Sequence, residues 1–228
     1  MGKYDPIGVF DSGVGGLTVV KSLIEILPHE NFIYFGDTAH VPYGNKTTEQ
    51  LFSYAYNITD FLIANKVKAI IVACGTHSSV TLPKLSGEYS LPMLGVVKPG
   101  AWAASNITRN GKIGIVATKA TVNSQAYNKE IENINSDYEV FAMACPKFVP
   151  LVESGVLEGD EVRQAVAEYI GPLLTKGIDT LVLGCTHYPF LSPAINEYVG
   201  NDITLVDPSY ATIVELKNIL AEMDLLND

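Results

Sequence analysis

Short apolar runs alternate with longer amphipathic segments along the whole chain. The runs are rich in Val, Ile and aromatic residues and are bounded by Gly, Asp, Asn or Pro, a pattern typical of buried β-strands. The pattern therefore predicts strands at residues 6–10, 31–35, 67–73, 91–97, 111–117, 138–144, 179–184 and 202–206.

Between these runs, apolar residues recur at helical spacing. Thr47 and Gln50 form a capping box before the second helix, and Asp160 is the expected N-cap of the fifth. Apolar strands that alternate with helices predict an α/β fold, with mostly parallel sheets covered by helices. The helices are expected at residues 17–27, 49–65, 101–107, 122–134, 160–177 and 211–226.

The two halves of the chain resemble each other. PIGVFDS (6–12) is similar to KIGIVAT (112–118), HVPY (40–43) to FVPL (148–151), and VACGTH (72–77) to LGCTHY (183–188). Three matches in the same order indicate an internal duplication. We therefore expect two pseudo-symmetric α/β domains with a cleft between them. The first would comprise residues 1–97 with 208–228, and the second residues 98–207.

Composition and charge narrow the class of protein. Of the 228 residues, 47% are hydrophobic and 18% charged, as in globular domains. The net charge of -10, with 15 scattered Lys and Arg residues, argues against a nucleic-acid partner. No apolar stretch is long enough to span a membrane, and the N-terminus lacks the apolar core of a signal peptide. Three cysteines without an export signal indicate free thiols in the cytoplasm.

Two of the cysteines end predicted strands. Cys74 and Cys185 each follow an apolar run, with a Thr and a His close behind. Ligands of open parallel sheets lie beyond the carboxyl ends of the strands, so a thiol is expected on either wall of the cleft. One thiolate can then remove a proton from one face of a stereocentre while the opposite thiol returns a proton to the other face.

Neighbouring residues would tune these thiols. His187 can assist Cys185, and Asp11 can share a proton with Cys74, whereas Thr76 and Thr186 offer donors to a substrate carboxylate. A lone buried cysteine is usually an inert small hydrophobe. Cys145 lacks the Thr-His neighbourhood and is interpreted as such a residue.

The glycine-rich segment FDSGVGGLTVV allows another interpretation. Gly13, Gly15 and Gly16 follow a strand and open a helix, as phosphate-binding loops do. A dinucleotide fingerprint needs a third glycine at position 18, which is Thr18. We therefore expect backbone amides that approach an anion, with Asp11 and Ser12 directed into the cleft. No metal is expected, because HExxH and CxxC patterns are missing.

Five motifs together resemble the cofactor-independent aspartate/glutamate racemase family. They are IGVFDSGVGGLTV, YFGDTAHVPYG, VACGT, ACPKFVPLVESG and LGCTHYPFL, in the family's order between residue 7 and about residue 191. The resemblance implies that Cys74 and Cys185 are the acid/base thiols and that the substrate is glutamate. It also implies a bacterial cytoplasmic homodimer that makes D-glutamate for peptidoglycan without pyridoxal phosphate or metal. Substrate-binding positions carried over from the family are Asp11, Ser12, Tyr43, Gly44, Thr76, Thr186 and His187.

Three positions depart from the family pattern. Gly75, also assigned to the substrate site, stands where the family usually has Asn and so removes an amide from the carboxylate site. His77 replaces a small residue, and Lys98 replaces an acid. These departures leave two alternatives open: a racemase of aspartate or another small acidic amino acid, and a catalytically silent homologue that binds an acidic ligand or a protein partner.

Overall fold

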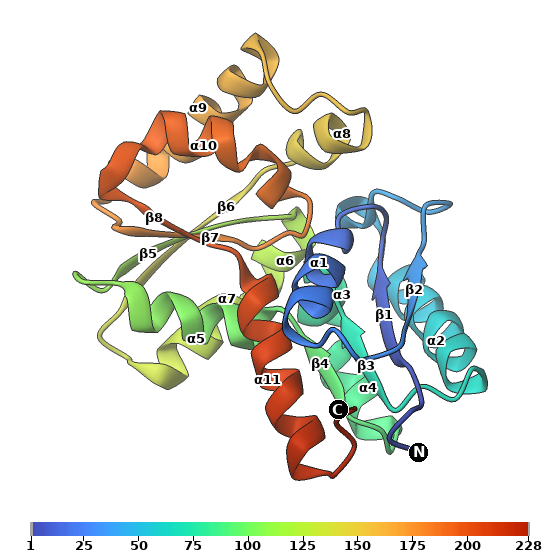
Figure 1. Cartoon of the computed structure of the whole chain (residues 1–228). Coiled ribbons are helices and arrows are strands. Elements are labelled where there is room, and N and C mark those ends of the chain that lie inside the picture. The colour runs from blue at the N-terminus through green and yellow to red at the C-terminus, as the bar shows by residue number, and fades with distance from the viewer. Residues whose placement is uncertain (1, 228) are drawn as a thin grey trace.

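The computed structural model describes residues 2–227 as two units, each built on a four-stranded parallel sheet (Figure 1). Strand order is the same in both sheets, β2-β1-β3-β4 and β6-β5-β7-β8. All eight predicted strands are present, and the predicted fold of two pseudo-symmetric α/β units is confirmed. The strands are β1 (Ile7–Asp11), β2 (Phe32–Gly36), β3 (Ala69–Val72), β4 (Met93–Gly95), β5 (Lys112–Ala117), β6 (Glu139–Ala144), β7 (Thr180–Leu183) and β8 (Thr204–Val206).

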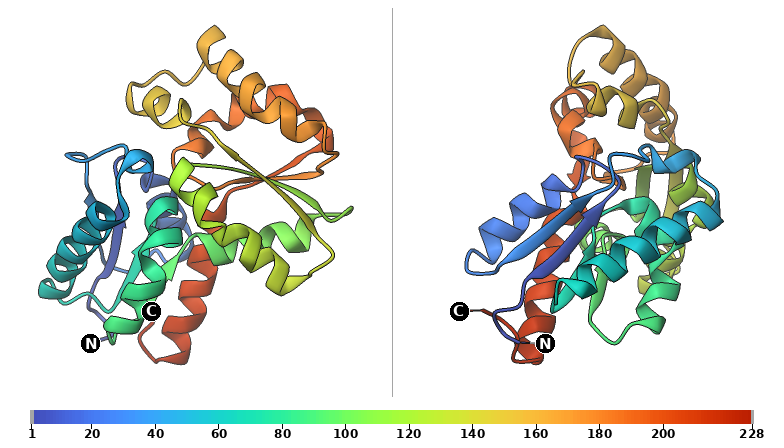
Figure 2. Two further views of the ribbon diagram at one scale, coloured as in Figure 1. Left: turned by 180° about the vertical axis from the view of Figure 1, so that it is seen from behind. Right: turned by 90° about the vertical axis from the view of Figure 1, so that its right-hand side faces the viewer.

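Helices follow nearly every strand and cover both faces of each sheet (Figure 2). They are α1 (Leu17–Ile26), α2 (Thr48–Ala64), α3 (Gly75–Val80), α4 (Leu82–Glu88), α5 (Val97–Ile107), α6 (Lys119–Ser124), α7 (Ala126–Ile134), α8 (Phe148–Glu153), α9 (Asp160–Leu174), α10 (Ser192–Val199) and α11 (Pro208–Glu222), with 3-10 turns η1 (Tyr43–Asn45), η2 (Tyr188–Leu191) and η3 (Gly200–Asp202).

Alternate side chains of each strand point to opposite faces of the sheet and pack into separate parts of the hydrophobic core. In the first sheet, Ile7 and Val9 pack under α1 and α11, whereas Phe10 packs under α2. In the second sheet, one face packs on α5 and α7 and the other on α8, α9 and α10. Helix α11 contacts both α1 and α5, so the last helix joins the two units. The division into residues 1–97 with 208–228 and 98–207 stays a prediction.

Several helix boundaries differ from the expected ones. The capping box of Thr47 and Gln50 is confirmed, with both reciprocal hydrogen bonds present. The N-cap of α9 is Gly159, at φ 100°, rather than Asp160, which lies in the first turn. The segment expected as one helix at 122–134 is split, because Gln125 adopts a left-handed conformation between α6 and α7. Helices α3, α4, α8 and α10 were not predicted, since each is too short to show a clear period.

A buried ion pair holds the two ends of the chain on the first unit. Lys68 Nζ lies 2.5 Å from Glu30 Oε2, with both side chains almost fully buried. Lys68 also donates to the carbonyls of Lys3 and Leu225, and the Asn227 amide donates to Glu30. A buried charge without such a partner would be costly. The first and last described segments of the chain therefore lie near each other at one end of the first unit (Figures 1 and 2).

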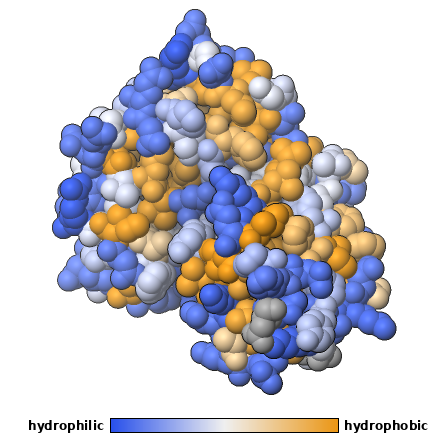
Figure 3. Space-filling model, in the orientation of Figure 1, coloured by the Kyte–Doolittle hydropathy of each residue, from blue (hydrophilic) through white to orange (hydrophobic). Residues whose placement is uncertain are grey.

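Most of the face shown in Figure 3 is hydrophilic, with apolar areas between and beside the two units. Exposed apolar side chains include Val14 and Leu17 near the start of α1 and Trp102 of α5. Within residues 2–227, no helix is both long enough and apolar enough to cross a membrane.

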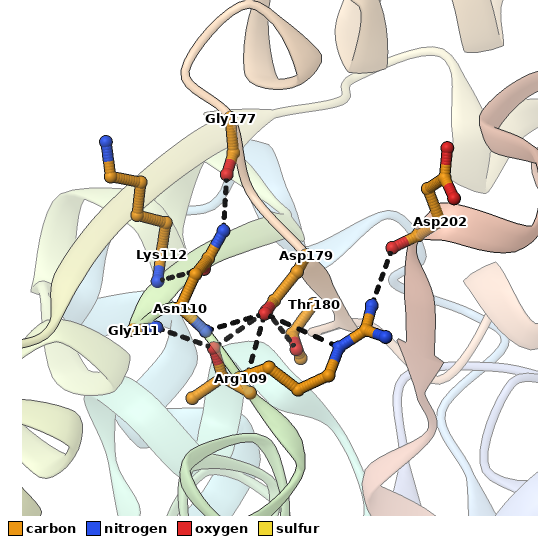
Figure 4. A network of polar contacts seen from close by, with 9 residues as sticks. Arg109, Asn110, Gly111, Lys112, Gly177, Asp179, Thr180 and Asp202 are labelled. Carbon is orange, nitrogen blue, oxygen red and sulfur yellow. Dashed lines mark hydrogen bonds and ion pairs between the residues drawn. The ribbon is translucent and has the colours of Figure 1, made fainter.

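Asp179 organises the end of the second sheet opposite the cysteines (Figure 4). One carboxylate oxygen accepts hydrogen bonds from Thr108 Oγ1 (2.7 Å) and Thr180 Oγ1 (2.8 Å). The other accepts from the backbone amides of Arg109 (2.7 Å) and Asn110 (2.8 Å). Burial alone would raise the pKa of Asp179, but the four donors outweigh it and hold the pKa below its ordinary value.

We predict that Asp179→Asn lowers the free energy of unfolding by about 1.5 to 3 kcal/mol at pH 7, because the amide cannot accept from both pairs of donors. A carboxylate whose folded pKa is depressed stabilises the fold above its unfolded pKa, about 3.9, and loses this effect as pH falls through the folded pKa. The difference between wild type and variant should therefore shrink below about pH 4 in urea titrations. Asp137→Asn, at an exposed position of the same unit, is the control. A pH-independent difference would contradict the prediction.

Candidate active site

Cys74 and Cys185 lie at equivalent places in the two units. Cys74 follows β3 and is the N-cap of α3, and Cys185 follows β7. Both thiols line one cavity of about 60 Å³ between the units, beyond the carboxyl ends of the strands. Six of the predicted substrate-binding residues line the same cavity: Ser12, Tyr43, Gly44, Thr76, Thr186 and His187.

Asp11 lies behind the cavity wall and joins the two units. Its carboxylate accepts from the Gly13 amide at 3.0 Å and, across the units, from Thr186 Oγ1 at 3.0 Å. Burial raises the pKa of Asp11, while His187 and these donors oppose the rise. Asp11 therefore acts on the site through Thr186 and through its charge.

Gly75 is also outside the cavity lining, and its environment explains the glycine. A Cβ atom on Gly75 would come within 3.0 Å of the Gly184 carbonyl oxygen, closer than real Cβ atoms approach such an atom. The backbone before Cys185 therefore occupies the space that a side chain at position 75 would need. The glycine at this position is therefore explained by close packing between the units.

Glu153, which the sequence reasoning did not single out, holds His187 in place. His187 Nε2 lies 2.5 Å from Glu153 Oε1, and His187 Nδ1 lies 3.8 Å from Cys185 Sγ. Because the Glu153 carboxylate can only accept, Nε2 carries a proton, and Nδ1 is the ring nitrogen that faces the thiol. Glu153 belongs to the quoted motif ACPKFVPLVESG, but only the fold brings it to His187.

The glycine-rich segment meets this pair from the first unit. The Val14 amide donates to Glu153 Oε1 at 3.3 Å. A Cβ atom on Gly13 would collide with Glu153, and one on Gly15 would collide with His187. The backbone amides of this segment thus approach two carboxylates, Glu153 through Val14 and Asp11 through Gly13, and the glycines allow the two units to meet closely.

Burial keeps both cavity thiols protonated in this state. Desolvation, with the nearby charge of Asp11, raises the pKa of Cys74 to about 12 despite opposing hydrogen bonds from the backbone of α3 and from Ser12. Desolvation also raises the pKa of Cys185 well above its ordinary value, although the His187 amide opposes the rise. Each thiol therefore needs a change in its surroundings before it acts as a base.

Tyr43 is fixed by a polar and aromatic cluster. Its hydroxyl donates to Asp37, whose carboxylate also lies 2.7 Å from His40 Nδ1. His77 packs edge-on against the Tyr43 ring, with centroids 4.7 Å apart, and is fully buried. Desolvation lowers the pKa of His77 to about 3, so this histidine is neutral and serves as packing.

A chain of hydroxyls crosses the cleft. Thr76 Oγ1 lies 2.9 Å from Thr118 Oγ1, which lies 3.0 Å from Thr121 Oγ1. Thr118 also lines the cavity, and so does Cys145, which the sequence analysis interpreted as structural. No group of three or more His, Cys, Asp or Glu side chains in the described part of the chain is arranged to hold a metal ion.

A cavity between two α/β units that is lined by one strand-end thiol from each unit and by several hydroxyls defines an enzyme site suited to proton transfer. A family profile described as Asp/Glu/Hydantoin racemase matches residues 7–216, and the chain belongs to this family. It is 50% identical to the glutamate racemase of Neisseria meningitidis serogroup B (strain MC58) over 228 residues, which is 100% of this chain and 84% of the relative.

Solved structures support the same family assignment. The chain superposes on a glutamate racemase isoform from Bacillus anthracis with a TM-score of 0.96 and 39% identity, covering 99% of this chain and 85% of that one. It is also similar to the Francisella tularensis glutamate racemase in complex with D-glutamate, with a TM-score of 0.92, 40% identity, and coverage of 99% and 84%. The resemblance inferred from the five motifs is confirmed.

We predict that Gly75→Ala lowers stability by about 1 to 3 kcal/mol, because the new Cβ forces the backbone near Gly184 to move. Gly75→Asn should raise the KM for glutamate rather than lower it. Thermal unfolding and steady-state kinetics measure the two effects. Gly87→Ala, where no atom lies within 4 Å of the new Cβ, is the matched control and should be harmless. A lower KM in Gly75→Asn would show that the missing amide matters more than packing.

Alkylation should report the raised thiol pKa values. Because burial favours the neutral thiols, the rate of iodoacetamide labelling at Cys74 and Cys185 should be low at pH 7. It should rise about tenfold per pH unit through pH 9.5. Peptide mass spectrometry measures each cysteine separately, and far-UV circular dichroism checks that the fold persists. A labelling rate that levels off below pH 8 would contradict the prediction.

Proposed function

We propose that the protein is a glutamate racemase that interconverts L-glutamate and D-glutamate by two-base proton transfer at the α-carbon. The observation that carries the proposal is the pair of thiols, Cys74 and Cys185, on opposite walls of one cavity between two matched sheets. The similarity of nearly the whole chain to glutamate racemases, including one solved in complex with D-glutamate, supports the choice of substrate.

Binding of the substrate changes the surroundings of the thiols. The α-ammonium group places a positive charge in a cavity where burial and Asp11 disfavour thiolates, so it stabilises a thiolate. His187 Nδ1, oriented by Glu153, accepts the proton of Cys185. Donors from Ser12, Thr76, the backbone at Thr186 and the backbone near Gly44 line the cavity for the substrate carboxylates and stabilise the charge that develops as the α-proton leaves.

Each proton that is removed or added in the reaction can be assigned to one of the two thiols. In the direction from L- to D-glutamate, the Cys185 thiolate removes the α-proton and becomes a thiol. The α-carbon, left with the electron pair, takes a proton from the Cys74 thiol on the other face, which leaves a thiolate. The reverse direction exchanges these roles. The family resemblance assigns Cys185 to the face of L-glutamate. The steps need neither pyridoxal phosphate nor a metal.

The rival activity on aspartate rested on the departure at Gly75. Since the Gly184 carbonyl fills the neighbouring space, Gly75 gives no support to a smaller substrate. A silent homologue is disfavoured because both thiols, His187 and Glu153 are assembled. From the family resemblance we further propose a cytoplasmic homodimer that supplies D-glutamate for peptidoglycan.

Circular dichroism of L-glutamate incubated with the purified protein, with no cofactor added, tests the function. The optical signal should decay to zero for wild type and stay constant for Cys74→Ser and Cys185→Ser, because a serine hydroxyl is too weak an acid to form the required base. In D2O, Cys74→Ser should exchange the α-proton of L-glutamate only, and Cys185→Ser that of D-glutamate only.

Cys145→Ala is the control, since it removes a thiol from the same cavity wall without removing either base. This variant should still racemise glutamate. If both serine variants exchanged the same enantiomer, or if either racemised at the wild-type rate, the two-base mechanism would be wrong. A constant signal with wild-type protein would reject the proposed substrate.

A further inference from the structure

Lys119 is the one Lys or Arg side chain among the described residues that line the cavity. It is exposed, it follows Thr118, and it is the first residue of α6. The turn η1, which carries Gly44 and Asn45, packs against α6 from the other unit. Lys119 therefore lies where the two units meet at the mouth of the cavity.

The acidic side chains near the cavity already have partners. Asp11 is buried with its two donors, Asp37 contacts His40 and Tyr43, and Glu153 contacts His187. Within residues 2–227, Lys119 has no ion pair or side-chain hydrogen bond. The net charge of -10 repels an anion that approaches the protein. An unpaired cation at the mouth of the cavity reduces this repulsion along the path by which an anionic substrate enters.

Local structure gives no reason for a lysine at this position. Cations in the first turn of a helix are disfavoured by the helix dipole. The N-cap bond of α6 comes from Thr118, whose hydroxyl accepts from the Thr121 amide at 3.3 Å. A residue that opposes its local preference without a structural partner is a candidate for function.

We propose that Lys119 attracts the dicarboxylate substrate to the cleft and contributes to its selection over neutral amino acids. This inference rests on the proposed function, because it assumes an acidic amino-acid substrate. Glutamate has two carboxylates and one ammonium group, so its net charge is negative, and Lys119 acts as a point charge rather than as an acid or base. Its contribution therefore depends on ionic strength and affects substrate capture more than the chemical step.

Steady-state racemisation by wild type, Lys119→Gln and Lys119→Glu, in both directions, tests the proposal. At about 0.01 M KCl, Lys119→Gln should lower kcat/KM about three- to tenfold, with kcat within about twofold of wild type, and Lys119→Glu should lower kcat/KM further. At about 1 M KCl, where the screening length falls from about 30 Å to about 3 Å, the deficit of Lys119→Gln should be under about twofold. Lys129→Gln removes the same charge from an exposed position on α7, outside the cavity, and should match wild type.

Calorimetric binding of glutarate, an inert dicarboxylate, separates this proposal from the proposed function. Lys119→Gln should bind glutarate more weakly than wild type at low salt and nearly equally at high salt. If wild type binds glutarate in this salt-dependent way but does not racemise glutamate, the function fails and the role of Lys119 stands. Equal glutarate affinity in both proteins at low salt, or a kinetic loss that is insensitive to salt or confined to kcat, would overturn the role of Lys119.

Discussion

The close approach of the two units at the carboxyl ends of their sheets is the constraint on which the site depends. At this junction, glycines stand where side chains would collide: Gly75 against the Gly184 carbonyl, and Gly13 and Gly15 against Glu153 and His187. Polar contacts complete the junction, since Thr186 donates to Asp11 and Thr76 contacts Thr118. Backbone contact and short hydrogen bonds together hold two independent cores at a separation that encloses a small cavity.

That enclosure explains the electrostatics of the site. Burial disfavours thiolates at Cys74 and Cys185, and the nearby charge of Asp11 adds to the effect. The same burial strengthens the interaction with a substrate ammonium group once it enters. In the proposed mechanism, a thiol that burial keeps protonated becomes a base only beside the substrate ammonium group, which suits an enzyme that must abstract a weakly acidic proton.

The arrangement is symmetric in its backbone and asymmetric in its supporting residues. Both cysteines follow the third strand of a sheet in chain order, so their positions derive from the duplicated topology. Their neighbours differ: Cys185 has His187 held by Glu153, whereas Cys74 has Asp11, Ser12 and the amides at the start of α3. The pKa of each thiol is therefore set by a different group of neighbours, although the two cysteines hold equivalent places in the fold.

The sequence by itself determined the eight strands, the duplicated α/β fold and the strand-end cysteines, because apolar periodicity and turn residues act over short distances. Short helices such as α3 and α8 were not predicted from the sequence, because one or two helical turns show no clear hydrophobic period. Only the tertiary structure decided that Glu153 orients His187, that Asp11 acts through Thr186, and that Gly75 is a packing residue. These contacts join residues far apart in the chain, and they form only when the two units close on each other. The raised thiol pKa values were decided in the same way, because desolvation depends on what surrounds a group in space and not on its neighbours in sequence.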